Sequence, residues 1–423
     1  MKKILSAILF SSFVALSVSS VNAGESKAGG LELSGNIDVV TGWQHDGKNS
    51  AGDFAGGQLG WFRGFTAPGR DTFDFYVDQV ELDINKSFGE NIRIRADLDF
   101  GRQLSGSGRN TNTANPFAIP APANNFSTNS NFELEQGYVT FNLKGAEVLI
   151  GRFNAPIGYY VVDRADNPTI SFSENYNYLT PTNITGGKIY YAFSDLIDWH
   201  VYVVNNLADS IPFGSNLPAP TANGNLGNPG GLTNGAYSAI PSWGERLGFN
   251  WGADDTKSTL GISYAGGPER FGCNFNPAAL TATGCNRHLT TIVDLDWAVK
   301  FTPALLFAGE GTFRQDNAIS GPNDRAYAAF GLLNYDINSN WRVYGRFGWM
   351  QDRNGFYTGA LNPVTGAPMG QNIYDGAVGF GYQIAEGAKM KVEYSPTVFV
   401  PRKAPGVGTA WSNGFALEFA YNF

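Results

Sequence analysis

The sequence predicts an all-β protein, a transmembrane antiparallel β-barrel of about sixteen strands with short periplasmic turns and long extracellular loops. Composition is the first observation. Charged residues make up 16% of the 423 residues, aromatic residues 14%, and there are 53 glycines, whereas soluble globular proteins carry about 25% charged residues. Patterning is the second. Segments of about ten to fourteen residues alternate apolar and polar side chains, and the connectors between them are alternately short and long.

The overall hydropathy excludes the other common membrane architecture. Mean hydropathy is −0.19, which argues against a bundle of transmembrane helices. No segment beyond the N-terminus reaches the roughly 18 consecutive apolar residues that a spanning helix needs. Strands with one face toward lipid and one toward water would give this mixture.

The last segment of the chain shows the alternation most clearly. One face carries Phe415, Leu417, Phe419, Tyr421 and Phe423, and the other carries Ala416, Glu418, Ala420 and Asn422. Segment 92–100 repeats the pattern, with Arg93, Arg95, Asp97 and Asp99 on one face. Aromatic residues near the strand ends are typical of the girdle at a membrane interface.

We expect the strands at residues 31–43, 72–86, 92–104, 130–143, 146–155, 184–194, 197–208, 242–252, 258–266, 287–301, 304–316, 324–336, 340–353, 373–384, 388–400 and 412–423. Fourteen or eighteen strands are the alternatives, because segments such as 130–143 alternate poorly. The barrel must close, since hydrocarbon offers no water to an open sheet edge. About sixteen strands leave an aqueous lumen, whereas about eight would fill with side chains.

The N-terminus predicts export. Met1-Lys2-Lys3 precedes an apolar run over 4–18, and Val21-Asn22-Ala23 places small residues before a cut at Gly24. We therefore expect a signal peptide at 1–23 and a barrel domain at 24–423 in the bacterial outer membrane. An N-terminal membrane anchor is the alternative, but the apolar run is short for one. In an oxidising compartment Cys273 and Cys285 are expected to form a disulfide, with two free thiols as the alternative.

Polar strand faces are expected to line the lumen. The predicted pore wall comprises Arg93, Arg95, Asp97, Asp99, Asp294, Asp296, Glu310, Arg342 and Arg346. Opposed charges across a lumen tune ion selectivity, and the slight excess of acid favours cations weakly. The alternative is that neighbouring charges neutralise each other and only keep the interior wet.

The connector 156–183 is the candidate constriction, because an apolar loop with many aromatic residues is unfavourable in solvent. The expected constriction residues are Arg152, Asp163, Arg164 and Asp166. A lid or a subunit contact is the alternative role for this loop.

Catalysis is not expected. Only His45, His200 and His288 are present, and their spacing does not match a metal site or the His of a nucleophilic triad. We expect no metal, no cofactor and no nucleic-acid partner, since there is no basic domain. A plugged structural or adhesive barrel is the main alternative to an open pore, and an outer-membrane hydrolase is a weaker one.

A central stretch carries motif-like residues: Glu135-Gln136-Gly137-Tyr138-Val139, the segment from Val148 to Tyr159, then Asp163, Asn167, Pro168, Ser171-Phe172-Ser173, Gly186-Gly187 and Val203-Val204-Asn205. It resembles the OmpL-like family of outer-membrane β-barrel porins. The C-terminal Phe419, Tyr421 and Phe423 resemble the signal read by the barrel-assembly machinery. The resemblance implies a passive pore for ions and small hydrophilic solutes, embedded in outer-membrane lipid, with a homotrimer as one option.

Overall fold

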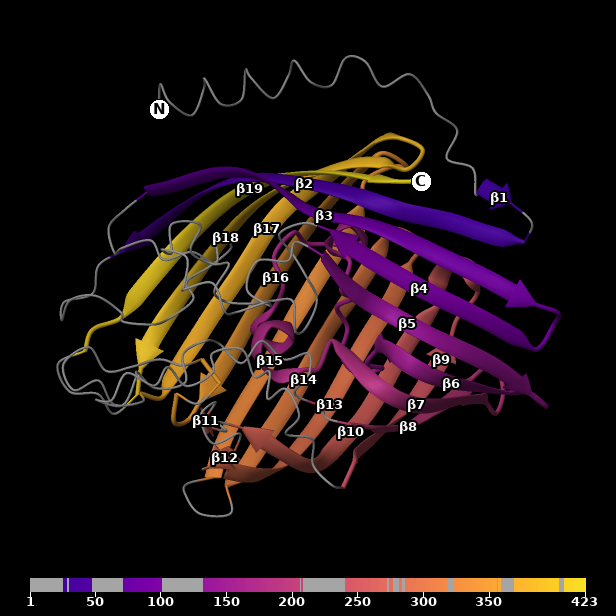
Figure 1. Ribbon diagram of the computed structural model, residues 1–423. Helices are drawn as coiled ribbons and strands as arrows, with labels where there is room; N and C mark the ends of the chain where they lie inside the picture. Colours follow the sequence, from indigo (N-terminus) through magenta and orange to yellow (C-terminus); the bar gives the residue numbers. More distant parts are fainter. Residues whose placement is uncertain are drawn as a thin grey trace.

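The chain closes into a single antiparallel β-barrel (Figure 1). The structure is a computed structural model that describes residues 26–28, 30–47, 71–100, 132–205, 207, 240–271, 274–276, 281–283, 286–318, 323–355, 357–358, 369–402 and 407–423. The predicted signal peptide and the predicted disulfide between Cys273 and Cys285 lie outside these residues. Within them, no helix is long and apolar enough to cross a membrane.

Sixteen strands form the wall. They are β2 (Leu31–Gly47), β3 (Asp71–Phe88), β4 (Ile92–Phe100), β5 (Phe132–Leu143), β6 (Ala146–Asn154), β7 (Asn183–Ala192), β8 (Ile197–Val204), β9 (Ser242–Trp251), β10 (Ser258–Phe271), β13 (Asn286–Thr302), β14 (Leu305–Ala318), β15 (Asn323–Asp336), β16 (Trp341–Asp352), β17 (Gln371–Ala385), β18 (Ala388–Pro401) and β19 (Ala410–Asn422). The prediction of sixteen strands is confirmed, and each expected strand has a counterpart at nearly the same residues.

The first and last wall strands close the ring. β19 pairs with β2 from Trp411↔Gly47 to Asn422↔Asn36. The C-terminal residue extends this ladder, because the Phe423 N–H donates to the Gly35 carbonyl at 2.9 Å and the Gly35 N–H donates to the Phe423 carbonyl at 3.1 Å. Neither of these two strands is therefore left with an unpaired edge, as a hydrocarbon environment requires.

Local backbone chemistry sets the connectors and the irregularities. The turn between β5 and β6 consists of Lys144 and Gly145, both with positive φ (52° and 91°), as a two-residue hairpin turn requires. The poor alternation within β5 has its cause in a β-bulge. Gln136 pairs with Asp97 and Leu134 with Leu98, so Glu135 is an extra residue in β5.

Three short strands were not predicted. β1 (Ser26–Ala28) pairs with β2, and β11 (Asn274–Asn276) pairs with β12 (Thr281–Thr283) as a hairpin within the loop between β10 and β13. Strands this short carry too few residues for a period of two to be recognised.

The alternation in sequence becomes two chemically different faces. On β16, Val343 and Phe347 are exposed on the outer face (40% and 65%), whereas Tyr344 and Arg346 are buried inside. Aromatic residues gather near both ends of the outer face: His45 lies against Trp43 and Trp411, and Trp341 lies 4.5 Å from Tyr382 between ring centroids. An apolar outer band with aromatic rims is the surface that a bilayer solvates.

Candidate functional site

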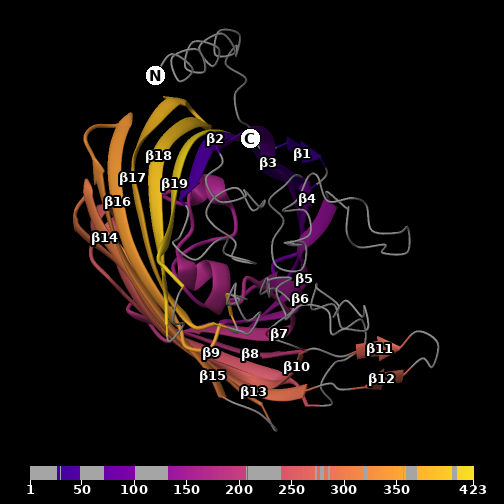
Figure 2. The same cartoon turned by 90° about the vertical axis from the view of Figure 1, so that its left-hand side faces the viewer.

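The segment between β6 and β7 lies inside the barrel (Figure 2, magenta). We call residues 155–182 the inner loop. It contains a 3-10 turn, η3 (Arg164–Asp166), and a single π-helical turn, η4 (Asn175–Leu179). Most of its side chains are buried, including Tyr160 and Phe172. An aromatic loop avoids water in this position, which is why it folds inward.

Aromatic packing attaches the inner loop to the wall. Phe172 and Tyr176 stack with ring centroids 4.2 Å apart. Tyr160 lies 5.2 Å from Phe330 of β15, and the same cluster includes Tyr344 of β16. Close ring pairs of this kind contribute about 0.5–1.5 kcal/mol each beyond the buried area.

A buried carboxylate fixes the middle of the inner loop. Glu393 of β18 accepts the backbone N–H groups of Ile170 and Ser171 at 2.7 and 3.1 Å, and the Ser171 hydroxyl at 2.5 Å. The hydroxyl of Tyr344 is the fourth group that donates to the Glu393 carboxylate, at 3.1 Å. Because hydrogen bonds to an ionised acceptor are stronger than neutral ones, this contact anchors the loop.

A buried arginine adds a second anchor. Arg346 of β16 pairs with Asp375 of β17, with Nη2 and Oδ2 2.8 Å apart. Its guanidinium also donates to the Tyr160 hydroxyl at 2.9 Å and to the Ser171 hydroxyl at 3.0 Å. One side chain therefore binds the wall and the loop together.

The two ends of the inner loop contact β14. Glu310 accepts the Tyr159 backbone N–H at 2.8 Å. Asn175 donates to the hydroxyl of Thr312 at 2.8 Å. These contacts lie across the barrel from β6, where the loop begins, so the loop crosses the lumen.

The charged part of the inner loop faces β3 and β18. Asp163 accepts from the Gln79 amide at 2.8 Å, and Arg164 pairs with Asp78 at 2.5 Å. Asp166 pairs with Lys389 at 3.3 Å. Burial, together with the nearby carboxylates of Asp99 and Asp166, raises the pKa of Asp163 to about 6.

The inner loop also contacts the wall on the other side of the ring. Ile157 packs in one cluster with Tyr202 of β8 and Ala265 of β10, and the Ser263 hydroxyl of β10 donates to the Pro156 carbonyl at 3.5 Å. On the inner faces of β4 and β6, Arg93 and Glu147 lie 3.7 Å apart and stay partly exposed.

The predicted wall residues all have inward parity. Arg93, Arg95, Asp97 and Asp99 alternate with the outward Ile92 and Ile94. Asp294, Asp296 and Glu310 are buried inside, and Arg342 has the parity of Arg346. Glu310 and Arg346, however, are covered by the inner loop, so their charges hold the loop and do not meet water.

Arg152 lies on the other face. Its parity is that of Ile150, which is 58% exposed on the outer side, and it pairs with Gly137 in register. Its Nε donates to the carbonyls of Leu134 and Glu135 at 3.1 Å each. The expectation that Arg152 lines a constriction is therefore wrong. Alternation in a sequence shows which residues share a face of a strand, but it does not show which of the two faces points into the lumen.

Sequence reasoning missed several residues that matter to this arrangement. Gln79, Asp78 and Asp375 hold the inner loop or its anchors, yet nothing in their own segments distinguishes them from other inward polar residues. Glu135 is buried inside although its neighbours give no regular alternation, because it is the bulged residue.

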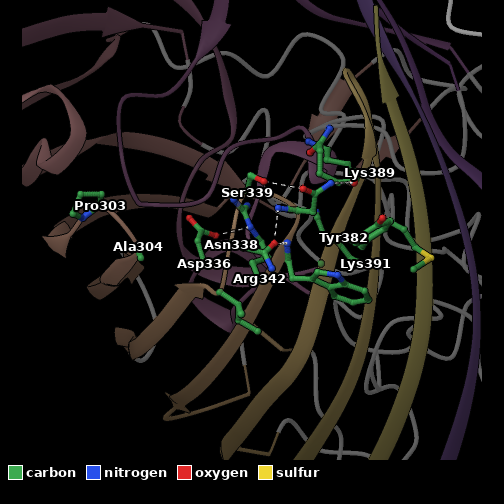
Figure 3. A pocket seen from close by; sticks show the side chains of 15 residues that line it. Pro303, Ala304, Asp336, Asn338, Ser339, Arg342, Tyr382, Lys389 and Lys391 are labelled. Atoms are coloured by element: carbon green, nitrogen blue, oxygen red, sulfur yellow. Dashed lines mark hydrogen bonds and ion pairs between the residues drawn. The ribbon is translucent and has the colours of Figure 1, made fainter.

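A cavity of about 460 Å³ opens at the short-turn end of the barrel (Figure 3). Arg342, Lys389 and Lys391 line it together with Asp336. Arg342 pairs with Asp336 at 3.1 Å, and both side chains remain substantially exposed. The lining of this cavity therefore holds three basic side chains and one acidic one, and Lys391 is in turn paired with Glu418 at 2.9 Å.

The histidines do not form a catalytic arrangement in the part of the chain that is described. His200 lies 4.7 Å from Tyr190 between ring centroids and 3.6 Å from Asp198, on the inner face of β8. His45 belongs to the outer aromatic rim. The side chain of His288 lies outside the described residues.

Solved structures with a similar fold include outer-membrane channels. The channel DcaP of Acinetobacter baumannii is 11% identical with a TM-score of 0.56, covering 95% of this chain and all 100% of the other. The anion-selective porin from Comamonas acidovorans is 10% identical with a TM-score of 0.54, covering 93% and 99%. Salmonella typhi OmpF, in complex with daunomycin, is 10% identical with a TM-score of 0.53, covering 95% and 100%. At these identities the likeness concerns the fold alone.

Sequence comparison identifies the family. No curated protein matches the chain. The family described as beta-barrel porin-2, OmpL-like, matches residues 30–423, which is nearly the whole barrel. The closed sixteen-stranded wall, its apolar outer face and its charged lumen agree with that match. This chain therefore belongs to the beta-barrel porin-2 family and is an outer-membrane porin.

Proposed function

We propose that the inner loop forms the constriction of this porin and that the resulting passive channel prefers small cations. The observation that carries the proposal is the pair of anchors on the far wall. Glu393 and Arg346 bind Ile170, Ser171 and Tyr160 of a loop that starts on β6. A loop held at both sides of a lumen narrows it at a fixed position.

The path for solutes runs through the part of the lumen that the inner loop does not fill. Arg93, Glu147 and Asp166 are among the partly exposed charges of the lumen and the inner loop. Ions and small hydrophilic solutes fit such a polar passage, and no step of chemical turnover is required of it.

Charge supports the preference for cations. Arg246 pairs with Asp296 and Arg314 pairs with Asp316, so these basic groups are neutralised. On β3 and β4 acidic side chains outnumber basic ones, since one arginine, Arg95, is shared by Asp83 and Asp97. Fixed negative charge in a lumen attracts cations and repels anions.

The test is single-channel recording of the refolded, signal-free protein in a planar bilayer under a salt gradient. Discrete steps with a reversal potential of the sign for cations would support the proposal. Steps with anion selectivity would contradict the charge argument. Insertion without conductance would favour the plugged structural or adhesive barrel. The predicted homotrimer and contact with the assembly machinery stay predictions.

A further inference from the structure

Three carboxylates meet on the inner face of three neighbouring strands. Glu81 of β3, Asp99 of β4 and Glu135 of β5 each place a carboxylate oxygen within 4.8 Å of the other two. Their exposed fractions are 3%, 0% and 0%. We call these residues the acidic triad.

The hydrogen-bond donors around the acidic triad are too few to satisfy all of its carboxylate oxygens. Asn36 donates to Glu81 at 2.5 Å, and Gln79 donates to one oxygen of Asp99 at 3.1 Å. The second oxygen of Asp99 and both oxygens of Glu135 have no hydrogen-bond partner. Among the described residues, no lysine or arginine forms an ion pair with the triad.

The position of Glu135 is evidence that is independent of the other two acids. It is the extra residue of the β5 bulge, so its inward position does not follow from strand alternation. Bulges re-aim side chains and occur next to functional sites. The backbone irregularity thus turns a fully buried, unpartnered carboxylate toward Glu81 and Asp99.

Three buried carboxylates this close repel one another and are poorly solvated, so their ionised form needs a counter-charge. We propose that the acidic triad binds a hard divalent cation, Ca²⁺. The donors are all oxygen and include neither His nor Cys, which favours Ca²⁺ over transition metals. Oxygens up to 4.8 Å apart agree with a central ion bound at about 2.3–2.6 Å to each.

The site is coupled to the inner loop. The Gln79 amide donates to Asp99 of the triad and, at 2.8 Å, to Asp163 of the loop. Ca²⁺ at the triad would therefore orient Gln79 and, through it, the charged part of the loop. This inference concerns a site beside the proposed constriction, and it does not depend on the channel being open.

The test uses signal-free protein refolded in detergent, free of lipopolysaccharide, and treated with EDTA. Calorimetric titration with CaCl₂ should show one saturable site per barrel, and the thermal unfolding midpoint should rise with Ca²⁺, since a ligand that binds only the folded state stabilises it. Glu135→Gln should abolish both responses, and Glu81→Gln should weaken binding at least tenfold. A wild-type protein that shows neither response overturns the proposal, and then protons neutralise the triad.

The matched control is Glu147→Gln. Glu147 lies on the inner face of the next strand, β6, but it is partly exposed and pairs with Arg93, so this variant should bind Ca²⁺ as the wild type does. Unaltered Ca²⁺ binding by both Glu135→Gln and Glu81→Gln would also overturn the proposal. Conductance measured on the same preparations separates the two proposals: a channel without a Ca²⁺ response refutes only the cation site.

Discussion

The Glu393 carboxylate of β18 accepts the backbone N–H of Ile170 at 2.7 Å, although 223 residues separate the two in sequence. This contact holds the inner loop against the far wall. In Glu393→Ala, two loop amides and two hydroxyls lose their acceptor, at a cost of about 1–3 kcal/mol for each donor left buried and unpaired. We expect larger and noisier single-channel conductance. Glu386→Ala, in an exposed short turn, is the control. Unchanged conductance and noise in Glu393→Ala would mean that the loop does not depend on this anchor.

Arg346 and Asp375 form a buried ion pair at 2.8 Å. We expect Arg346→Ala to lower the free energy of unfolding by about 3–5 kcal/mol, because it leaves Asp375 buried and uncompensated. Urea titration of the refolded barrel would measure the change. The double variant Arg346→Met, Asp375→Leu should recover part of the loss.

The control for this prediction is the exposed pair of Arg342 and Asp336. Arg342→Ala should cost less than about 1 kcal/mol, since exposed ion pairs contribute little. Equal losses for Arg346→Ala and Arg342→Ala would contradict the role of burial.

We expect the titration of Asp163 to make the ion selectivity of the channel depend on pH. Burial raises its pKa to about 6, so its negative charge is lost as pH falls from 7 to 5, and the preference for cations should decrease over that range. Because this folded-state pKa lies above that of an exposed Asp, protonation favours the folded state. The resulting stabilisation is full at low pH and is lost as pH rises through about 6.

Reversal potentials of the wild type and of Asp163→Asn between pH 5 and 7 would test this. Glu81, Asp99, Gln79 and Asp166 surround the carboxyl, so only the difference between the two proteins reports Asp163. Identical pH profiles would exclude it as the titrating group.

Arg152 should not contribute to selectivity. Its side chain starts on the outer face and donates to the Leu134 and Glu135 carbonyls at 3.1 Å. We expect Arg152→Ala to leave the reversal potential at pH 7 unchanged, whereas Asp163→Asn shifts it toward zero. A shift in Arg152→Ala as large as that in Asp163→Asn would return Arg152 to the pore.

The sequence was sufficient for the wall. In segments such as 92–100, lipid must contact Ile92 and Ile94 while water or polar groups contact Arg93 and Arg95, so a period of two is imposed along the whole strand. Closure follows from the same solvent, since hydrocarbon cannot satisfy an open strand edge. The number of strands, their approximate bounds and the inward parity of the predicted wall residues could therefore be predicted.

Only the tertiary structure decided what the inward residues contact. Arg346 and Glu310 are on the predicted face, but the inner loop covers them, and this depends on contacts between segments far apart in the chain. The bulge at Glu135 shifts the local register by one residue, which reverses the face of a side chain. The outward position of Arg152 follows from regular alternation on β6 and became known only when the face of that strand was assigned. Alternation in sequence reports the solvent on each side of a strand. It does not report which partner, distant in sequence, lies opposite a given charge.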